Sequence, residues 1–412
     1  MIDLELEEKT LPKAFLVGKD NLSELHGLVD TLGMEICGEM ILVRPEPAPR
    51  YGIGNGKAEE IFHHAEAENA DCIIFDFEIS PTHQRNWEKL CKFPVFDRHE
   101  VILRIFAARA RTKEAVLQVE LAKLEYSLPR LAHTYGDLAR QRGGSYGAKG
   151  SGETKLELDR RQVQEKMLRI KKELEKVKKE RDTGRKRREK LPLPSCALVG
   201  YTNSGKSSLL NALTGAEVLV ENKLFATLDP TTRRFSLPGG CGTLLTDTVG
   251  FISNLPHSLV DAFKSTLEEA ARASLLLIVL DSTDPEVFFQ YDTVMSVLEE
   301  IGADKVPSVI VLNKTDAVTE PLLTMRLLQR FPDAIQTSAL TRFGFEKLTE
   351  AVCEKLLGGE KAYLIPIEKR HLVEEIRKNG IIYEELWQES SIYVRARAAE
   401  REASLLAQYE TQ

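Results

Sequence analysis

Residues 200–207 constrain the fold of this chain more than any other stretch, because they read G-x-x-x-x-G-K-S. The short apolar run 197–199 precedes them, and the helix-prone run 208–213 follows them. A strand, a glycine-containing loop and a helix in this order form a phosphate-binding loop, in which successive backbone N–H groups and the helix N-terminus point at one anion. A glycine-rich turn with a chance lysine would not explain this ordered spacing. The residues expected to contact a nucleotide here are Gly200, Tyr201, Thr202, Asn203, Ser204, Gly205, Lys206 and Ser207.

Two of these side chains have expected chemical roles. Lys206 is expected to reach the β- and γ-phosphates, and the hydroxyl group of Ser207 to ligate Mg²⁺. Forty residues later, an apolar run leads into a D-x-x-G motif, in which Asp247 is expected to hold Mg²⁺ through water and the Gly250 N–H to contact the γ-phosphate. The motif residues are Asp247, Thr248, Val249 and Gly250.

A third motif predicts which base is bound. Residues 309–312 are apolar and lead into Asn313, Lys314, Thr315 and Asp316. The Asp316 carboxylate can accept hydrogen bonds from the N1–H and the exocyclic amine of guanine, whereas adenine has neither donor and would leave the acceptors unpaired. Ser338, Ala339 and Leu340 follow a further apolar stretch and are expected to close over the base. The order and spacing of these motifs indicate a GTPase and not an ATPase.

The segment between the first two motifs is expected to contain a nucleotide-dependent switch, with Phe225, Ala226, Thr227, Leu228 and Asp229 near the nucleotide. A threonine in such a switch closes onto Mg²⁺ and the γ-phosphate when GTP is bound. Thr227, Thr231 and Thr232 are all chemically suitable, and spacing does not choose between them. Residue 251 is Phe, where many GTPases have a glutamine that orients the attacking water. Backbone groups, another side chain, a cation or a partner must therefore place that water.

Composition supports a multidomain chain that works in the reducing cytosol. The chain has 412 residues and a net charge of −7, yet residues 151–190 contain 16 Lys/Arg against 9 Asp/Glu, a local charge of +7. The six cysteines are scattered and form no C-x-x-C pair, so neither a disulfide framework nor a zinc site is indicated. The acidic start of the sequence does not resemble a signal peptide, and no apolar run is long enough to span a membrane. We expect a cytoplasmic protein, with peripheral association with ribosomes or membranes left open.

The sequence pattern divides the chain into four parts. Residues 1–98 alternate short strands with helices, which predicts a small parallel α/β domain. Residues 99–190 contain two heptad runs, 117–131 and 163–177, separated by the glycine-rich stretch 140–152, and this predicts an antiparallel helical hairpin in which Pro129 ends or kinks the first arm. Residues 191–358 form the expected GTPase domain. Residues 359–412 form a small α+β domain, with a strand near 392–397 that exposes Arg395 and Arg397 to RNA or to solvent.

The hairpin tip is a candidate RNA contact. Cations suit phosphates, and an aromatic side chain suits base stacking. A solvated loop with no partner is the equally simple alternative. The candidate residues are Arg140, Arg142, Tyr146 and Lys149.

Taken together, these features resemble the HflX family of translational GTPases, within the Obg–HflX superfamily. The resemblance covers almost the whole chain and includes residues 52–57, 84–87, 97–98, 105–112, 117–121, 150–154, 159–161, 200–207, 225–233, 247–252 and 255–257. It implies that Thr227 is the Mg²⁺-binding switch threonine, joining Ser207 and Asp247, and that Lys206, Thr227 and Gly250 serve catalysis. A hydrophobic residue such as Phe251 is typical of the group. One departure is Ser151, which stands between two glycines where the family commonly has proline.

The resemblance further implies a GTPase that binds the large ribosomal subunit, both RNA and protein, and that splits stalled ribosomes under stress. The alternative is a signalling switch whose hairpin binds a protein. Contacts with RNA phosphates would make binding steeply dependent on salt, and the alternative would not. Asn203 also resembles its counterpart in potassium-stimulated GTPases, so K⁺ is a hypothetical second cation beside Mg²⁺, although the side chain would equally serve to shape the loop. We expect a monomer.

Overall fold

The computed structural model describes residues 11–43, 47–134, 151–188, 194–216, 223–238, 241–253, 267 and 269–411. They fall into two compact units, one comprising described residues up to Lys178 and the other those from Lys179 onward. None of the helices in these ranges is both long enough and apolar enough to cross a membrane.

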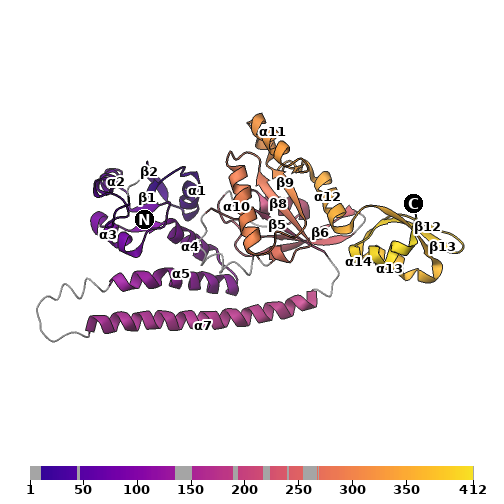
Figure 1. Cartoon of the computed structure of the whole chain (residues 1–412), viewed down its shortest axis with the longest axis horizontal. Coiled ribbons are helices and arrows are strands. Elements are labelled where there is room, and N and C mark those ends of the chain that lie inside the picture. The colour runs from indigo at the N-terminus through magenta and orange to yellow at the C-terminus, as the bar shows by residue number, and fades with distance from the viewer. Residues whose placement is uncertain are drawn as a thin grey trace, which may run out of the picture. The chain divides into compact units, whose positions relative to one another are not determined.

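The first unit begins with a parallel sheet in the order β2-β1-β3-β4, as the β–α repeat predicts. Phe15 and Val17 of β1 pack with α2 and α3 on one face, and α1 packs against α4 (Figure 1). The second strand begins at Glu35, before the apolar run expected at 40–43, because β2 is an edge strand that pairs with β1 from Lys13 and includes the exposed Glu35 and Glu39. The elements are β1 (Lys13–Gly18), α1 (Ser23–Leu32), β2 (Glu35–Ile41), α2 (Asn55–Ala67), β3 (Cys72–Phe75), α3 (Pro81–Cys91), β4 (Val95–Asp97) and α4 (Arg98–Arg109).

The first arm of the hairpin domain is described as two helices, α4 and α5 (Lys113–Thr134), with a break between them. Helix α4 ends at Arg109, and Ala110 has extended backbone angles. Helix α5 then begins, with Thr112 Oγ1 accepting the N–H of Ala115 at 3.2 Å. Pro129 was expected to end or kink this arm; it does not end it, because α5 continues through Pro129 to Thr134.

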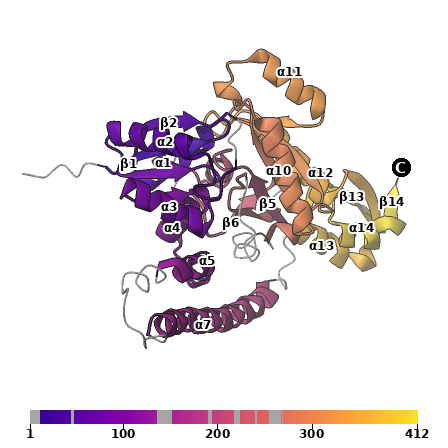
Figure 2. The same cartoon turned by 60° about the vertical axis from the view of Figure 1, so that its left-hand side comes forward.

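The second arm is the single helix α7 (Ser151–Arg188) of 38 residues, about 57 Å long at 1.5 Å per residue (Figure 2). The residues of the predicted heptad seam are less exposed than their neighbours: Ile170 is buried, and Val163, Met167, Leu174 and Val177 are half-buried. Lys166 Nζ lies 2.6 Å from Glu120 Oε1 of α5. The helix already includes Ser151 and Gly152, so the non-helical stretch expected to reach residue 152 stops sooner.

The second unit contains a six-stranded sheet in the order β10-β9-β8-β5-β7-β6, parallel except for β6. Helices α8 and α12 contribute to the core on one face, and α10 packs against β5 and β8 (Figure 1). This confirms the expected P-loop GTPase fold. The elements are β5 (Ser195–Gly200), α8 (Lys206–Thr214), β6 (Thr231–Ser236), β7 (Gly242–Asp247), β8 (Leu275–Asp281), α10 (Val287–Glu300), β9 (Ser308–Asn313), α11 (Pro321–Arg330), β10 (Ile335–Gln336) and α12 (Phe345–Leu357).

The third sheet, near the C-terminus, is antiparallel with the order β12-β13-β11-β14, as the α+β expectation requires. Ile392, Val394 and Ala396 of β13 face the core with α13 and α14. Arg397 is buried and paired with Glu350 of α12, whereas Arg395 is exposed and paired with Glu360 and Glu384. The elements are β11 (Lys361–Pro366), α13 (His371–Asn379), β12 (Ile381–Trp387), β13 (Ser391–Arg397), α14 (Glu400–Leu406) and β14 (Glu410–Thr411).

Candidate nucleotide-binding site

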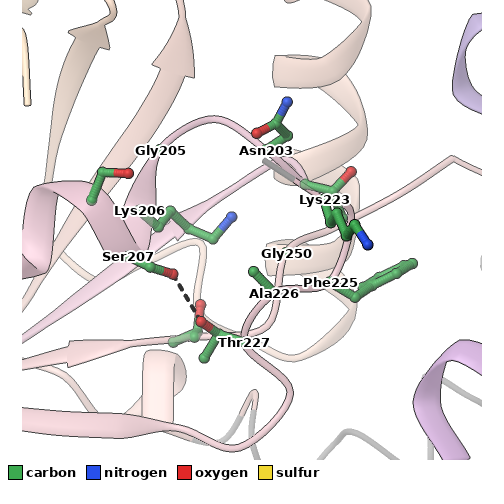
Figure 3. Close-up of a pocket in the computed structure, with 12 residues that line it drawn as sticks. Asn203, Gly205, Lys206, Ser207, Lys223, Phe225, Ala226, Thr227 and Gly250 are labelled. Carbon is green, nitrogen blue, oxygen red and sulfur yellow. Dashed lines mark hydrogen bonds between the residues drawn. The ribbon is translucent and has the colours of Figure 1, made fainter. Parts of the chain in front are cut away.

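The loop between β5 and α8 has the tight curl that a phosphate cradle requires (Figure 3). Asn203 and Gly205 adopt left-handed backbone angles, with φ of 60° and 91°. A Cβ atom at Gly205 would lie 2.3 Å from Asn313 Nδ2, so only glycine fits where the phosphate loop meets the predicted base-binding loop. The conformation of the phosphate loop is therefore matched to the position of Asn313 in the predicted base-binding motif.

Lys206 is the first residue of α8, and its side chain is buried. Its ammonium group donates to the carbonyl oxygens of Gly200 at 3.1 Å and Tyr201 at 2.6 Å. Burial lowers the pKa of Lys206 to about 8, although the nearby Asp247 carboxylate opposes this shift. A phosphate group would supply the negative charge that a buried ammonium lacks here.

Three oxygen-bearing side chains converge beside the loop, and they are the three predicted Mg²⁺ ligands. Ser207 Oγ lies 2.8 Å from Thr227 Oγ1 (Figure 3). Both hydroxyl groups donate to Asp247 Oδ2, at 2.6 and 2.8 Å. Asp247 Oδ1 is buried without a hydrogen-bond partner in the described part of the chain, and burial raises the pKa of this carboxyl group. Hydroxyl and carboxylate oxygens are hard ligands, so this donor set fits Mg²⁺.

The structure also separates the three candidate switch threonines. Thr231 and Thr232 lie in β6, where Thr232 Oγ1 is 3.0 Å from Thr246 Oγ1 of β7. Thr227 reaches Ser207 and Asp247 instead. The switch residues Phe225 and Leu228 are buried, and Ala226 and Asp229 are half-buried.

The D-x-x-G segment follows β7 and lies against the phosphate loop. Thr248 Oγ1 donates to the carbonyl oxygen of Leu198 at 2.7 Å. A Cβ at Gly250 would lie 2.8 Å from Thr202 Cα and 3.1 Å from Lys206 Nζ, which excludes a side chain. Val249 is buried, and Phe251 is 2% exposed.

Asn313 connects the predicted base-binding loops to the phosphate loop. Its Nδ2 donates to the Ser204 carbonyl oxygen at 3.0 Å, and its Oδ1 accepts the N–H of Ala339 at 3.2 Å. Thr315 Oγ1 donates to the Thr337 carbonyl oxygen at 2.9 Å, so a second hydrogen bond joins the Asn313–Asp316 loop to the loop that contains Ala339. These bonds hold the Asn313–Asp316 motif between the other two loops.

The remaining predicted residues differ in exposure. Lys314 Nζ lies 2.7 Å from Asp281 Oδ2 at the end of β8. Asp316 is exposed, and Ser338 is buried. Leu340 is 83% exposed.

Unpaired polar atoms mark the phosphate side of the site. Within the described ranges, Thr202 Oγ1 and Ser204 Oγ are buried and have no hydrogen-bond partner. Buried polar atoms of this kind are costly unless a ligand or water satisfies them. The pocket is lined by Thr202, Asn203, Gly205, Lys206, Ser207, Ser208, Lys223, Phe225, Ala226, Thr227, Thr248 and Gly250.

Two residues that line this pocket, Ser208 and Lys223, did not emerge from sequence reasoning. Ser208 directly follows the motif, but Lys223 belongs to no motif, and its position just before the switch segment was the only available signal. The predicted RNA contacts Arg140, Arg142, Tyr146 and Lys149 lie outside the described residues.

Three family models match consecutive parts of the chain. They are described as "GTP-binding GTPase N-terminal" for residues 19–107, "GTP-binding GTPase Middle Region" for 109–188 and "50S ribosome-binding GTPase" for 195–314. The protein named GTPase HflX from Akkermansia muciniphila is 43% identical over 375 residues, which cover 88% of this chain and 86% of that protein. GTPase HflX from Escherichia coli strain K12 is 44% identical over 341 residues, covering 82% and 80%.

The chain belongs to the GTPase HflX family. As an HflX-family GTPase it is an enzyme that hydrolyses GTP. Among solved structures, it is 28% identical to a GTP-binding protein from Sulfolobus solfataricus in complex with GDP, covering 84% of this chain and 98% of the other with a TM-score of 0.46.

Proposed function

We propose that this HflX-family GTPase binds the large ribosomal subunit and uses GTP to split or rescue stalled ribosomes under stress. The observation that carries the proposal is the match of its nucleotide-binding residues, 195–314, to a family described as ribosome-binding. The basic arm α7 supports it, because clustered cations favour RNA as a partner. The tip residues Arg140, Arg142, Tyr146 and Lys149 are the proposed RNA contacts.

Mg²⁺ is the proposed metal cofactor, held by Ser207, Thr227 and Asp247. Bound between the phosphate oxygens and these residues, it would neutralise charge that develops on the phosphates. Lys206 holds the β- and γ-phosphates in this proposal, and the backbone N–H of Gly250 contacts the γ-phosphate. Thr227 would be the ligand that distinguishes GTP from GDP, because its segment would close only in the GTP state.

Potassium is a proposed second cation. Its candidate ligand, Asn203, lines the phosphate pocket with a backbone φ of 60° (Figure 3). A cation there would stabilise charge between the β- and γ-phosphates during hydrolysis.

Sedimentation of the full chain with purified ribosomal subunits tests the proposal. We expect co-sedimentation with the large subunit that is stronger with a non-hydrolysable GTP analogue than with GDP, and that weakens steeply between 50 and about 200 mM salt. With 70S ribosomes and GTP, gradient profiles should show free subunits. A chain that hydrolyses GTP but does not sediment with either subunit would instead favour a signalling switch with a protein partner.

A further inference from the structure

The backbone that follows the D-x-x-G segment is paired directly with the phosphate loop. Thr202 N–H donates to the Phe251 carbonyl oxygen at 2.7 Å, and Phe251 N–H donates to the Gly200 carbonyl oxygen at 3.1 Å. These bonds form an isolated parallel bridge between Tyr201 and Phe251. Phe251 therefore contributes through its backbone at a position where many GTPases use a polar side chain.

The register of this bridge makes the D-x-x-G segment arch. In the sheet, Leu198 of β5 pairs with Asp247 of β7. At the bridge, Tyr201 pairs with Phe251. The P-loop strand advances three residues between these points and the other strand advances four, so one extra residue is accommodated in 248–250. Gly250, whose N–H is expected to face the γ-phosphate, lies in this arch.

The side chain of Tyr201 makes a further hydrogen bond, to the backbone that follows Phe251. Its hydroxyl oxygen accepts the backbone N–H of Ser253 at 2.7 Å, and Tyr201 and Ser253 are only 6% and 9% exposed. On the near side, Thr248 Oγ1 donates to Leu198. The arch is thus held at both ends, and Gly250 within it has no room for a Cβ because Thr202 Cα would lie 2.8 Å away.

We propose that Tyr201 is a positioning residue for GTP hydrolysis, whose hydroxyl group holds the backbone at Ser253 so that Gly250 presents its N–H to the γ-phosphate. The inference rests on the proposed nucleotide contacts of Gly250. Sub-ångström placement of such a donor matters, because a displacement of about 1 Å lowers rates by up to about a hundredfold. Residue 251 is Phe and has no polar side chain that could orient the attacking water. In this proposal, the backbone hydrogen bonds around it position the Gly250 N–H instead.

The substitution Tyr201→Phe in the full chain removes the hydroxyl group and keeps the ring. We expect kcat for GTP hydrolysis to fall about tenfold, which is the effect of one modest transition-state interaction. The Kd for GDP should be unchanged within about twofold, because GDP has no γ-phosphate for Gly250 to contact. A role limited to supporting the fold would lower the Tm and weaken GDP binding together with turnover.

Tyr363→Phe is the matched control, since Tyr363 is 1% exposed in β11 of the C-terminal sheet. It should hydrolyse GTP at the wild-type rate. Hydrogen exchange read by mass spectrometry gives an independent measurement: the amide of Ser253 should exchange faster in Tyr201→Phe than in the wild type and the control.

The outcomes separate this inference from the proposed function. Wild-type turnover in Tyr201→Phe, or unchanged exchange at Ser253, would overturn the positioning role while leaving the nucleotide site intact. A parallel loss of folding and GDP affinity would overturn it as well, in favour of a structural role. If the D-x-x-G assignment itself were wrong, the isosteric variant Asp247→Asn would hydrolyse GTP at the wild-type rate, whatever Tyr201→Phe does.

Discussion

At the scale of single residues, Thr227 shows how the fold decides between chemically equal candidates. Three threonines lie within six residues, and each has the hydroxyl group that Mg²⁺ requires. Two of them are committed to the antiparallel strand β6, while Thr227 precedes the strand and reaches Ser207 and Asp247. The choice follows from where the strand begins, which local spacing does not reveal.

Thr227→Ala should therefore lower kcat for GTP hydrolysis by at least about tenfold, because the proposed metal ligand of the GTP state is lost. GDP affinity should change little, since the switch closes on the γ-phosphate. Thr227→Ser keeps the hydroxyl group and should retain most activity, and Thr232→Ala is the control from β6. Turnover assays and fluorescent GDP titration measure both quantities. An equal loss of GTP turnover in Thr232→Ala would refute the distinction between the two threonines.

Asp316 carries the predicted selectivity for guanine. Asp316→Asn should weaken GTP binding by at least about a hundredfold and improve binding of xanthosine triphosphate, whose 2-position carries oxygen in place of the amine. Competition of both triphosphates against a fluorescent nucleotide gives the two affinities. Asp333→Asn removes an exposed carboxylate from the loop before β10 and serves as the control. A variant that still prefers GTP would show that Asp316 does not contact the base.

At the scale of elements, a buried carboxylate connects α5 to the N-terminal sheet. Asp97 ends β4, is fully buried, and caps α4 by accepting the N–H of Glu100 at 3.0 Å. From α5, Tyr126 donates its hydroxyl to Asp97 at 2.9 Å, and Arg130 donates at 3.2 Å. The Arg130 guanidinium also stacks on the Tyr126 ring at 3.4 Å. Burial and the Asp97 charge raise the pKa of Tyr126 far above its usual range, so it remains a donor.

Asp97→Asn should lower the unfolding free energy of the N-terminal unit by about 3 kcal/mol, because Arg130 would lose the charge that compensates its own burial. Trp87 is fully buried and donates to the Tyr51 carbonyl oxygen at 3.0 Å, so its fluorescence reports on this unit. The chain has two tryptophans, and a Trp387→Phe background isolates this signal in a denaturant titration.

Glu60→Gln is the control for this substitution. It breaks an exposed ion pair with Lys57 in α2 and should change the unfolding free energy by less than about 1 kcal/mol. Equal effects of the two substitutions would mean that the buried carboxylate does not anchor α5.

At the scale of the whole molecule, we propose two separate roles: the nucleotide site hydrolyses GTP, and the hairpin contacts the ribosome. The triple variant Arg140→Gln, Arg142→Gln, Lys149→Gln should keep basal GTP turnover and lose most stimulation by large subunits, because it removes phosphate contacts without touching the GTP site. The control Lys305→Gln, Lys355→Gln, Lys378→Gln removes the same charge from exposed positions outside the hairpin. Turnover with and without subunits, alongside gradient profiles, decides the outcome. Full stimulation of the tip variant would exclude the tip as a ribosome contact.

Local sequence pattern was sufficient to predict much of the fold and of the candidate site. The phosphate loop, the order of the nucleotide motifs, the β–α repeat and the heptad seam of α7 were predictable because each depends on residues close together in the chain, through strand or helix periodicity and the backbone freedom of glycine. Sequence pattern predicted strands less well at sheet edges, where strands expose polar side chains. The start of β2 was placed too late, and β12 was not predicted at all.

Tertiary structure alone decided which distant groups meet. Thr227 was separated from Thr231 and Thr232, Arg397 was paired with Glu350, and Asp97 was joined to Arg130 across 33 residues. The hydroxyl of Tyr201 meets the N–H of Ser253 across 52 residues, although neither residue carries a motif signal for that contact. The physical reason is that a hydrogen bond between distant residues depends on the packing that brings its donor and acceptor within about 3 Å, and local spacing carries no information about that packing.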